Sequence, residues 1–135
     1  MHKNIVIESK LKNIKGVVSE IIGLLKTKKA DESDIFDIRL SLEETLINAI
    51  KYGNKFDKSL PVSIDVSCEE NLISITIEDK GEGFDYKGVP DPTEEENILR
   101  SRGRGVFLVK HIMDKVEYNK KGNRITMVKR LKTPK

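Results

Sequence analysis

The feature that most constrains the fold of this chain is a pair of alternating apolar runs. In residues 61–68 and again in 72–78, β-branched apolar residues alternate with polar ones. This period of two is typical of strands that bury one face, and the short polar segment 69–71 between the runs suits a hairpin turn. The sequence therefore predicts two antiparallel strands at the heart of a sheet.

Two segments before this hairpin have the periodicity of helices. Residues 11–28 carry apolar side chains along one helical face. Asp31 and Ser33 are candidate N-caps for a second helix that runs to about Tyr52, where Gly53 followed by Asn54 makes a natural stop. The remaining expected elements are a strand at 4–9, a helix at 106–113 and a C-terminal hairpin formed by 116–119 and 124–131.

Length and composition predict one globular domain over residues 1–135, with a flexible C-terminal tail from about 132. Apolar residues make up 37% and charged residues 35% of the 135-residue chain. The formal charge of +3 comes from 25 basic and 22 acidic residues. Such a mixed surface argues against direct nucleic-acid binding, in which basic residues dominate one face.

The chain has the composition of a cytoplasmic protein. Cys68 is the only cysteine, so no intrachain disulfide forms and a reducing compartment fits. No apolar run approaches the roughly 20 residues that span a bilayer. Glu8 follows the N-terminus too closely for a signal peptide. We expect no membrane association.

Asp79 marks the first candidate site, because it ends the second strand of the hairpin and is followed by Gly81 and Gly83. Glycine has no Cβ and allows positive φ, so a flat ligand can approach the backbone here. An alternative interpretation is an ordinary turn, since Asp and Gly are common turn residues.

Glu44 and Asn48 form the second candidate site. They lie four residues apart on the second helix and therefore share a face that points away from its apolar stripe. A carboxylate and an amide in this arrangement suit a general base and a ligand of a hard cation. A plain solvated helix face is the alternative, and Glu43 is more easily explained as the partner of Arg39.

The third candidate site follows an irregular segment, residues 86–102, whose length suits a lid over a ligand. It ends in a sequence with three arginines and with Gly103 and Gly105 just before a predicted helix. Backbone N–H groups and the dipole at a helix start favour phosphate. A plain loop-to-helix junction is the alternative.

The order of these three sites resembles the N, G1 and G2 boxes of the GHKL ATPases, which include gyrase, heat-shock chaperone, histidine-kinase and mismatch-repair proteins. The likeness covers roughly Leu40 to Leu131. Within that superfamily, the length and the segment Gly103 to Asp114 are similar to the anti-sigma factor serine/threonine kinases. The resemblance implies a Bergerat ATP-binding fold: a two-layer α/β (α+β) sandwich with a mixed, mostly antiparallel sheet and helices on one face.

The resemblance also assigns roles to individual residues. Glu44 would be the catalytic base, and Asn48 would ligate Mg²⁺. Asp79 would accept a hydrogen bond from the adenine amino group of ATP, with Thr126 supporting the base through water. The nucleotide would further be held by Gly81 and Gly83 at the base and ribose, and by Gly103, Arg104, Gly105 and Val106 at the phosphates.

The implied function is that of a partner-switching regulator. A kinase of this family phosphorylates a serine or threonine of an anti-anti-sigma (STAS-type) partner, sequesters a sigma factor and forms a homodimer. A nucleotide-gated binding module without kinase activity is the alternative. A histidine-kinase fragment fits less well, because the only histidine near the N-terminus is His2.

Overall fold

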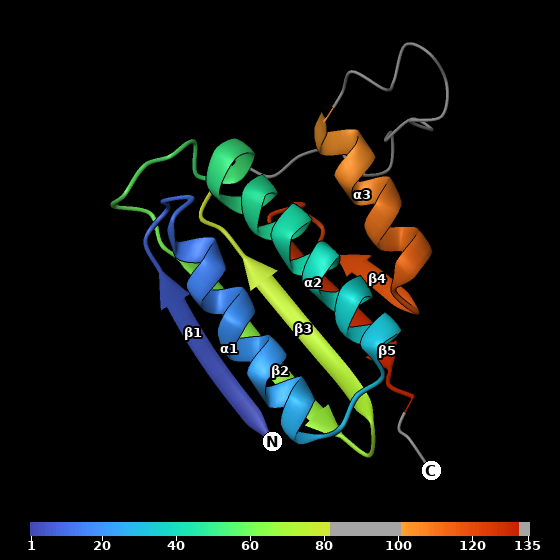
Figure 1. Ribbon diagram of the computed structural model, residues 1–135. Helices are drawn as coiled ribbons and strands as arrows, with labels where there is room; N and C mark the ends of the chain where they lie inside the picture. The colour runs from blue at the N-terminus through green and yellow to red at the C-terminus, as the bar shows by residue number, and fades with distance from the viewer. Residues whose placement is uncertain (82–100, 133–135) are drawn as a thin grey trace.

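The computed structural model describes residues 1–81 and 101–132, with residues 101–104 described by their backbone alone. In chain order the elements are β1 (His2–Ile7), α1 (Asn13–Thr27), α2 (Glu32–Ile47), the π-helical turn η1 (Asn48–Gly53), β2 (Val62–Glu69), β3 (Leu72–Glu78), α3 (Ser101–Ile112), β4 (Lys115–Tyr118) and β5 (Arg124–Arg130). The strands form one sheet, and all three α-helices lie on the same face of it (Figure 1).

The sheet has the strand order β1-β2-β3-β5-β4. The resemblance implied a mixed, mostly antiparallel sheet, and each of the four pairings between the described strands is antiparallel. The predicted hairpin of β2 and β3 is confirmed, with Ile64 opposite Ile77 and Ile77 opposite Ile125. The fold is therefore an α+β two-layer sandwich.

The hydrophobic core lies between the helices and this sheet. Along β2 and β3 every second side chain is buried, as the alternating pattern predicted. From α2 and η1 the side chains of Ile38, Leu42, Leu46 and Ile50 are fully enclosed. The central helix thus presents its apolar stripe to the sheet, which leaves its other faces to α1, α3 and solvent.

The start of α2 is as predicted, and the helical segment ends at Gly53 as predicted, but the geometry of its last turn differs. The Asp31 side chain accepts hydrogen bonds from the backbone N of Ser33 at 2.7 Å and from its hydroxyl at 2.6 Å. The last turn, η1, is π-helical rather than α-helical, and Asn54 N donates to Ala49 O at 2.8 Å. A π-helical turn inserts an extra residue per turn and is frequent at functional sites.

Helix α3 begins earlier than the sequence indicated. It starts at Ser101 instead of near Val106, so Gly103 and Gly105 lie inside its first turns. Two glycines close together favour a loop in sequence reasoning, whereas here the absent side chain of Gly105 allows α3 to approach α2. The predicted lid, apart from its last residues, and Gly83 lie outside the described residues.

Within residues 1–81 and 101–132, no helix is both long enough and apolar enough to cross a membrane.

Candidate functional site

A pocket opens between the C-terminal end of the central helix and the ends of two neighbouring strands. Its lining comes from α2 and η1 on one side and from β3, the end of β4, β5 and the turn between β4 and β5 on the other. The lining residues are Thr45, Asn48, Ala49, Ile77, Asp79, Tyr118, Gly122, Asn123, Arg124 and Ile125. Apolar walls with a few converging polar groups are the general character of small-molecule sites.

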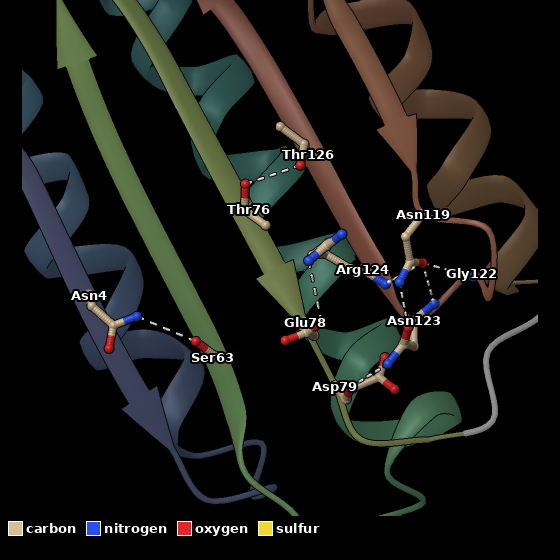
Figure 2. A network of polar contacts seen from close by, with 10 residues as sticks. All are labelled: Asn4, Ser63, Thr76, Glu78, Asp79, Asn119, Gly122, Asn123, Arg124 and Thr126. Atoms are coloured by element: carbon tan, nitrogen blue, oxygen red, sulfur yellow. Dashed lines mark hydrogen bonds and ion pairs between the residues drawn. The ribbon is translucent and has the colours of Figure 1, made fainter.

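Asp79 is the buried acid of this pocket, with 5% of its surface exposed. It follows β3 directly, and its backbone is held from both sides by Asn123 (Figure 2). Asp79 N donates to Asn123 O at 2.9 Å, and Asn123 Nδ2 donates to Asp79 O at 2.8 Å. Gly81 N donates to the Asp79 carboxylate at 2.8 Å. The orientation of this carboxylate is therefore set by the backbone around it.

Gly53 and Gly81 pack around the Asp79 carboxylate without room for a side chain. A Cβ at Gly53 would overlap the carboxylate atoms of Asp79, and a Cβ at Gly81 would overlap the carbonyl of Gly53. The obstacle at Gly81 is backbone, and the obstacle at Gly53 is a buried carboxylate that Gly81 N holds by a hydrogen bond, so a Cβ at either position displaces part of the site. Only glycine therefore fits at both positions, and we call the two glycines around the carboxylate the Asp79 cradle.

Asn54 joins this cradle to the rest of the fold. It is 2% exposed, and its Oδ1 accepts a hydrogen bond from Lys80 N at 2.8 Å. Its Nδ2 lies 2.9 Å from both Ser9 Oγ and Leu60 O. Because Lys80 stands between Asp79 and Gly81, Asn54 fixes the backbone that carries both.

The opposite wall is a turn built around Asn119. The Asn119 Oδ1 accepts from the backbone N of Gly122, Asn123 and Arg124 at 2.8, 3.0 and 3.1 Å. Asn119 Nδ2 also donates to Asn123 Oδ1 at 2.7 Å (Figure 2). Gly122 has φ of 84°, the left-handed region that glycine adopts without strain. The turn thereby holds Asn123 against Asp79.

Glu44 and Asn48 lie at the open side of the pocket, where α3 meets α2. A Cβ placed on Gly105 would lie 2.7 Å from Glu44 Oε2 and 3.6 Å from Asn48 Nδ2. Both side chains are half-buried, and within the described part of the chain neither makes a hydrogen bond or an ion pair. Because Gly105 has no side chain, the carboxylate and the amide keep space in front of them, and with no partner among the described residues they are suited to bind a ligand.

The chemistry of this arrangement suits a nucleotide better than a metal held by protein alone. Among the described residues, no group of three or more His, Cys, Asp or Glu side chains could hold a metal. A single amide oxygen suits Mg²⁺, which usually takes one or two protein ligands and completes its shell with phosphate and water. The Asp79 cradle suits a ring with an amino group, since a carboxylate can accept several hydrogen bonds at once.

The structure does not bring every predicted residue into this cluster. Thr126 lies on the open face of the sheet, where its hydroxyl is 3.1 Å from that of Thr76, and it does not line the pocket (Figure 2). Its alternation with buried Ile125 explains why: only one of the two can face the helices. Val106 is buried at 1% exposure, and Gly103 and Arg104 lie in the first turn of α3.

The residues of the site that escaped the sequence analysis include Gly53, Asn54 and Asn123. Gly53 and Asn54 were explained as the stop of a helix, which accounted for them fully. Asn123 was part of an expected turn. A signal was present in Asn54, an amide directly after a glycine stop, but nothing in the sequence shows its contact with Lys80.

The fold and the site define a nucleotide-binding class of domain. Residues 7–129 match the family described as histidine kinase-like ATPase domain. The chain belongs to this family.

Individual relatives are serine-protein kinases. The chain is 33% identical over 118 residues to serine-protein kinase RsbW of Staphylococcus aureus, strains MSSA476 and JH9, covering 82% of this chain and 74% of each relative. A structural neighbour is the crystal structure of the RsbU and RsbW domains of Rv1364c from Mycobacterium tuberculosis, with a TM-score of 0.66 and 17% identity. That likeness covers 99% of this chain but only 33% of the longer one, and it supports the fold alone.

Proposed function

We propose that this chain is an ATP- and Mg²⁺-dependent protein serine/threonine kinase that acts as an anti-sigma regulatory factor. In the cytoplasm it would phosphorylate a serine or threonine of an anti-anti-sigma (STAS-type) protein and sequester a sigma factor. The similarity to RsbW serine-protein kinases supports the reaction class. The observation that carries the proposal is the half-buried Glu44–Asn48 pair beside Gly105, without partners among the described residues.

The Asp79 pocket would bind the adenine ring. The carboxylate accepts a hydrogen bond from the exocyclic amino group, while Ala49, Ile77 and Ile125 contact the faces of the ring. We expect Asn123, rather than Thr126, to complete the polar side of this pocket, because Asn123 lines it and Thr126 does not. Gly81 lets the backbone beside this carboxylate pack against Gly53, since any Cβ there would collide with the Gly53 carbonyl.

The Glu44 end of the site would carry out the transfer. Mg²⁺, when bound, neutralises charge on the phosphates. Asn48 offers its amide oxygen as a ligand, and the backbone at the start of α3 favours the phosphate charge. Glu44 accepts the proton of the attacking hydroxyl, whose oxygen forms the new bond to phosphorus as the bond to ADP breaks.

The structure separates Glu44 from its neighbour Glu43. Glu44 faces Gly105 and Asn48, whereas Glu43 lines a groove between α1 and α2. Glu43 and Asn48 are five residues apart, so at about 100° per residue their side chains point about 140° apart around the helix. This difference supports Glu44 as the base.

Phosphorylation would act on the partner through charge. A phosphoserine adds about two negative charges at neutral pH, which disrupts an interface that was built for a hydroxyl. The unphosphorylated partner would bind the kinase and free the sigma factor, and the phosphorylated one would dissociate. The resemblance further implies that the kinase acts as a homodimer.

The first test is calorimetry of ATP·Mg²⁺ binding to the wild type and to Asp79→Asn. We expect micromolar binding by the wild type and a loss of at least about tenfold in the variant, because the amide can no longer accept as a carboxylate does. Absence of binding to the folded wild type would refute the nucleotide site.

The second test compares Glu44→Gln with Glu43→Gln in transfer from labelled ATP to a STAS-type protein of the same organism. Glu44→Gln should keep ATP affinity and slow transfer by roughly 10²-fold or more. Glu43→Gln should remain at least tenfold faster than Glu44→Gln. If ATP binds but neither wild type nor variants transfer phosphate, the chain is a nucleotide-gated binding module instead.

A further inference from the structure

A second concave surface lies on the outer side of the helical layer, between α1 and α2. It has a volume of about 830 Å³. We call it the α1–α2 groove; it is lined by Leu11, Ile14, Lys15, Val18, Ser19, Ile22, Gly23, Lys26, Arg39, Glu43, Ile47 and Lys51. None of these residues lines the Asp79 pocket.

The groove has one wall from each helix. On the α1 side the lining recurs at helical spacing from Leu11 to Lys26, and on the α2 side it recurs at every fourth residue from Arg39 to Lys51. The two helices run antiparallel beside each other (Figure 1). At 1.5 Å per residue the walls extend for about 18–22 Å, the length of a helix of roughly four turns.

The floor is apolar and the ends are cationic. Ile14, Val18, Ile22 and Ile47 supply the floor, and Leu11 at one end is 47% exposed. Gly23 has no side chain there and leaves open space above α1.

Two cations lie at each end of the groove. Because the helices are antiparallel, Lys15 of α1 lies toward the same end as Lys51, and Lys26 lies toward the same end as Arg39. All four side chains are exposed, and none takes part in an ion pair within the described residues. The expected pair of Arg39 with Glu43 is also absent there. Lys51 Nζ lies over the Tyr52 ring, 5.2 Å from its centre, a contact that leaves the positive charge in place.

We propose that the α1–α2 groove binds an amphipathic helix of a partner protein, with an apolar stripe along the floor and acidic residues at both ends. A helix laid in a hydrophobic groove is a recurrent mode of recognition, and charge complementarity sets its orientation and partner choice. A second copy of this chain is a poor occupant, since its own groove would bring lysine and arginine against lysine and arginine. This proposal does not depend on the kinase reaction.

The test uses three synthetic 16-residue peptides and the full chain. The acidic probe has leucine at helical spacing with glutamate on its flanks, the basic probe replaces glutamate by lysine, and the scrambled probe has the acidic composition without the stripe. Fluorescence anisotropy gives affinity, and amide shifts in NMR spectra of the labelled protein give location. We expect saturable binding of the acidic probe, at least tenfold tighter than either other peptide, weakened by added salt.

Matched pairs of charge-reversal variants test whether the peptide binds in the groove. The double variant Lys15→Glu with Lys26→Glu should bind the acidic probe at least tenfold more weakly than the wild type. Lys58 and Lys110 are exposed lysines outside the groove, so Lys58→Glu with Lys110→Glu should change the affinity for the acidic probe less than threefold. Equal thermal unfolding midpoints would show that both double variants are folded.

The proposal is overturned if the three peptides bind alike, if none saturates at millimolar concentration, or if the shifts map away from the groove. Sedimentation equilibrium tests whether a second copy of this chain occupies the groove instead. A dimer that the acidic probe fails to displace, and that Lys15→Glu with Lys26→Glu alters, would assign the groove to a second copy and also overturn the proposal.

Discussion

At the scale of single residues, the candidate site depends on three glycines that let distant segments touch. Gly53 lies under the Asp79 carboxylate, Gly81 lies against the carbonyl of Gly53, and Gly105 faces Glu44. In each case a Cβ would come within 2.7 Å or less of an atom from another segment. The functional groups therefore meet because the facing residues lack side chains.

Replacing Gly53 by alanine should damage the pocket more than the fold. The added methyl group would overlap the Asp79 carboxylate and force it out of its position. We expect ATP·Mg²⁺ affinity to fall at least tenfold, with a loss of unfolding free energy of roughly 1–3 kcal/mol from overpacking. Calorimetry and urea denaturation measure the two effects separately.

Gly16→Ala is the matched control for this change. Gly16 lies in α1, and a Cβ added there would meet nothing within 4 Å, so alanine should raise stability by roughly 0.5–1 kcal/mol and leave ATP affinity unchanged. If Gly53→Ala bound ATP as tightly as Gly16→Ala, the cradle around Asp79 would have no role in binding.

The sequence alone could predict those site residues whose position follows from the adjacent residues in the chain. Asp79 ends a strand, and Glu44 and Asn48 share a helix face. Asn54 and Asn123 act through contacts with residues 26 and 44 positions away, Lys80 and Asp79 respectively. Such contacts depend on the folded sheet and leave no local pattern.

At the scale of elements, the strands and the start of α2 were predictable, whereas η1 and the start of α3 were not. Alternation and capping are properties of a few adjacent residues. The π-helical turn at Asn48–Gly53 and the extension of α3 back to Ser101 arise where two elements pack closely. Tertiary contact there outweighs the local preference of glycine for a turn.

The N-cap of α2 should make stability depend on pH in acid. The Ser33 hydroxyl and backbone N–H donate to the Asp31 carboxylate and hold the pKa of Asp31 below its ordinary value of 3.8. A pKa lowered by folding gives stability that is present above the unfolded value and is lost as pH falls through the folded value. Wild type should therefore lose part of its stability below about pH 4 through this residue.

Asp31→Asn isolates this effect, because asparagine caps helices about as well but does not titrate. The wild type should be the more stable of the two at pH 6, and the difference should shrink as pH is lowered toward 3. Urea denaturation across that range measures it. A difference that stays constant with pH would show that the charge of Asp31 contributes nothing.

At the scale of the whole molecule, the helical layer and the sheet are joined by a buried lysine at the end opposite the candidate site. Lys129 of β5 is 8% exposed, and its Nζ donates to Ile112 O of α3 at 2.7 Å. The same Nζ lies 3.3 Å from the Asp37 carboxylate and 3.9 Å from that of Asp34, both on α2. One cation thus links α2, α3 and the sheet.

Lys129→Met should be among the most destabilising substitutions outside the apolar core. It would leave the carboxylate of Asp34, which is 2% exposed, without its cation, and breaking a buried pair in this way costs roughly 3–5 kcal/mol. Arg130→Met, at the exposed neighbouring position with no ion pair among the described residues, should cost less than about 0.5 kcal/mol. Urea denaturation compares the two.

Since Glu44 and Asn48 lie at the other end of α2, the folded fraction of Lys129→Met should still bind ATP·Mg²⁺ within a fewfold of wild type. A stability loss below about 1 kcal/mol would mean that the link among α2, α3 and the sheet rests on apolar packing alone.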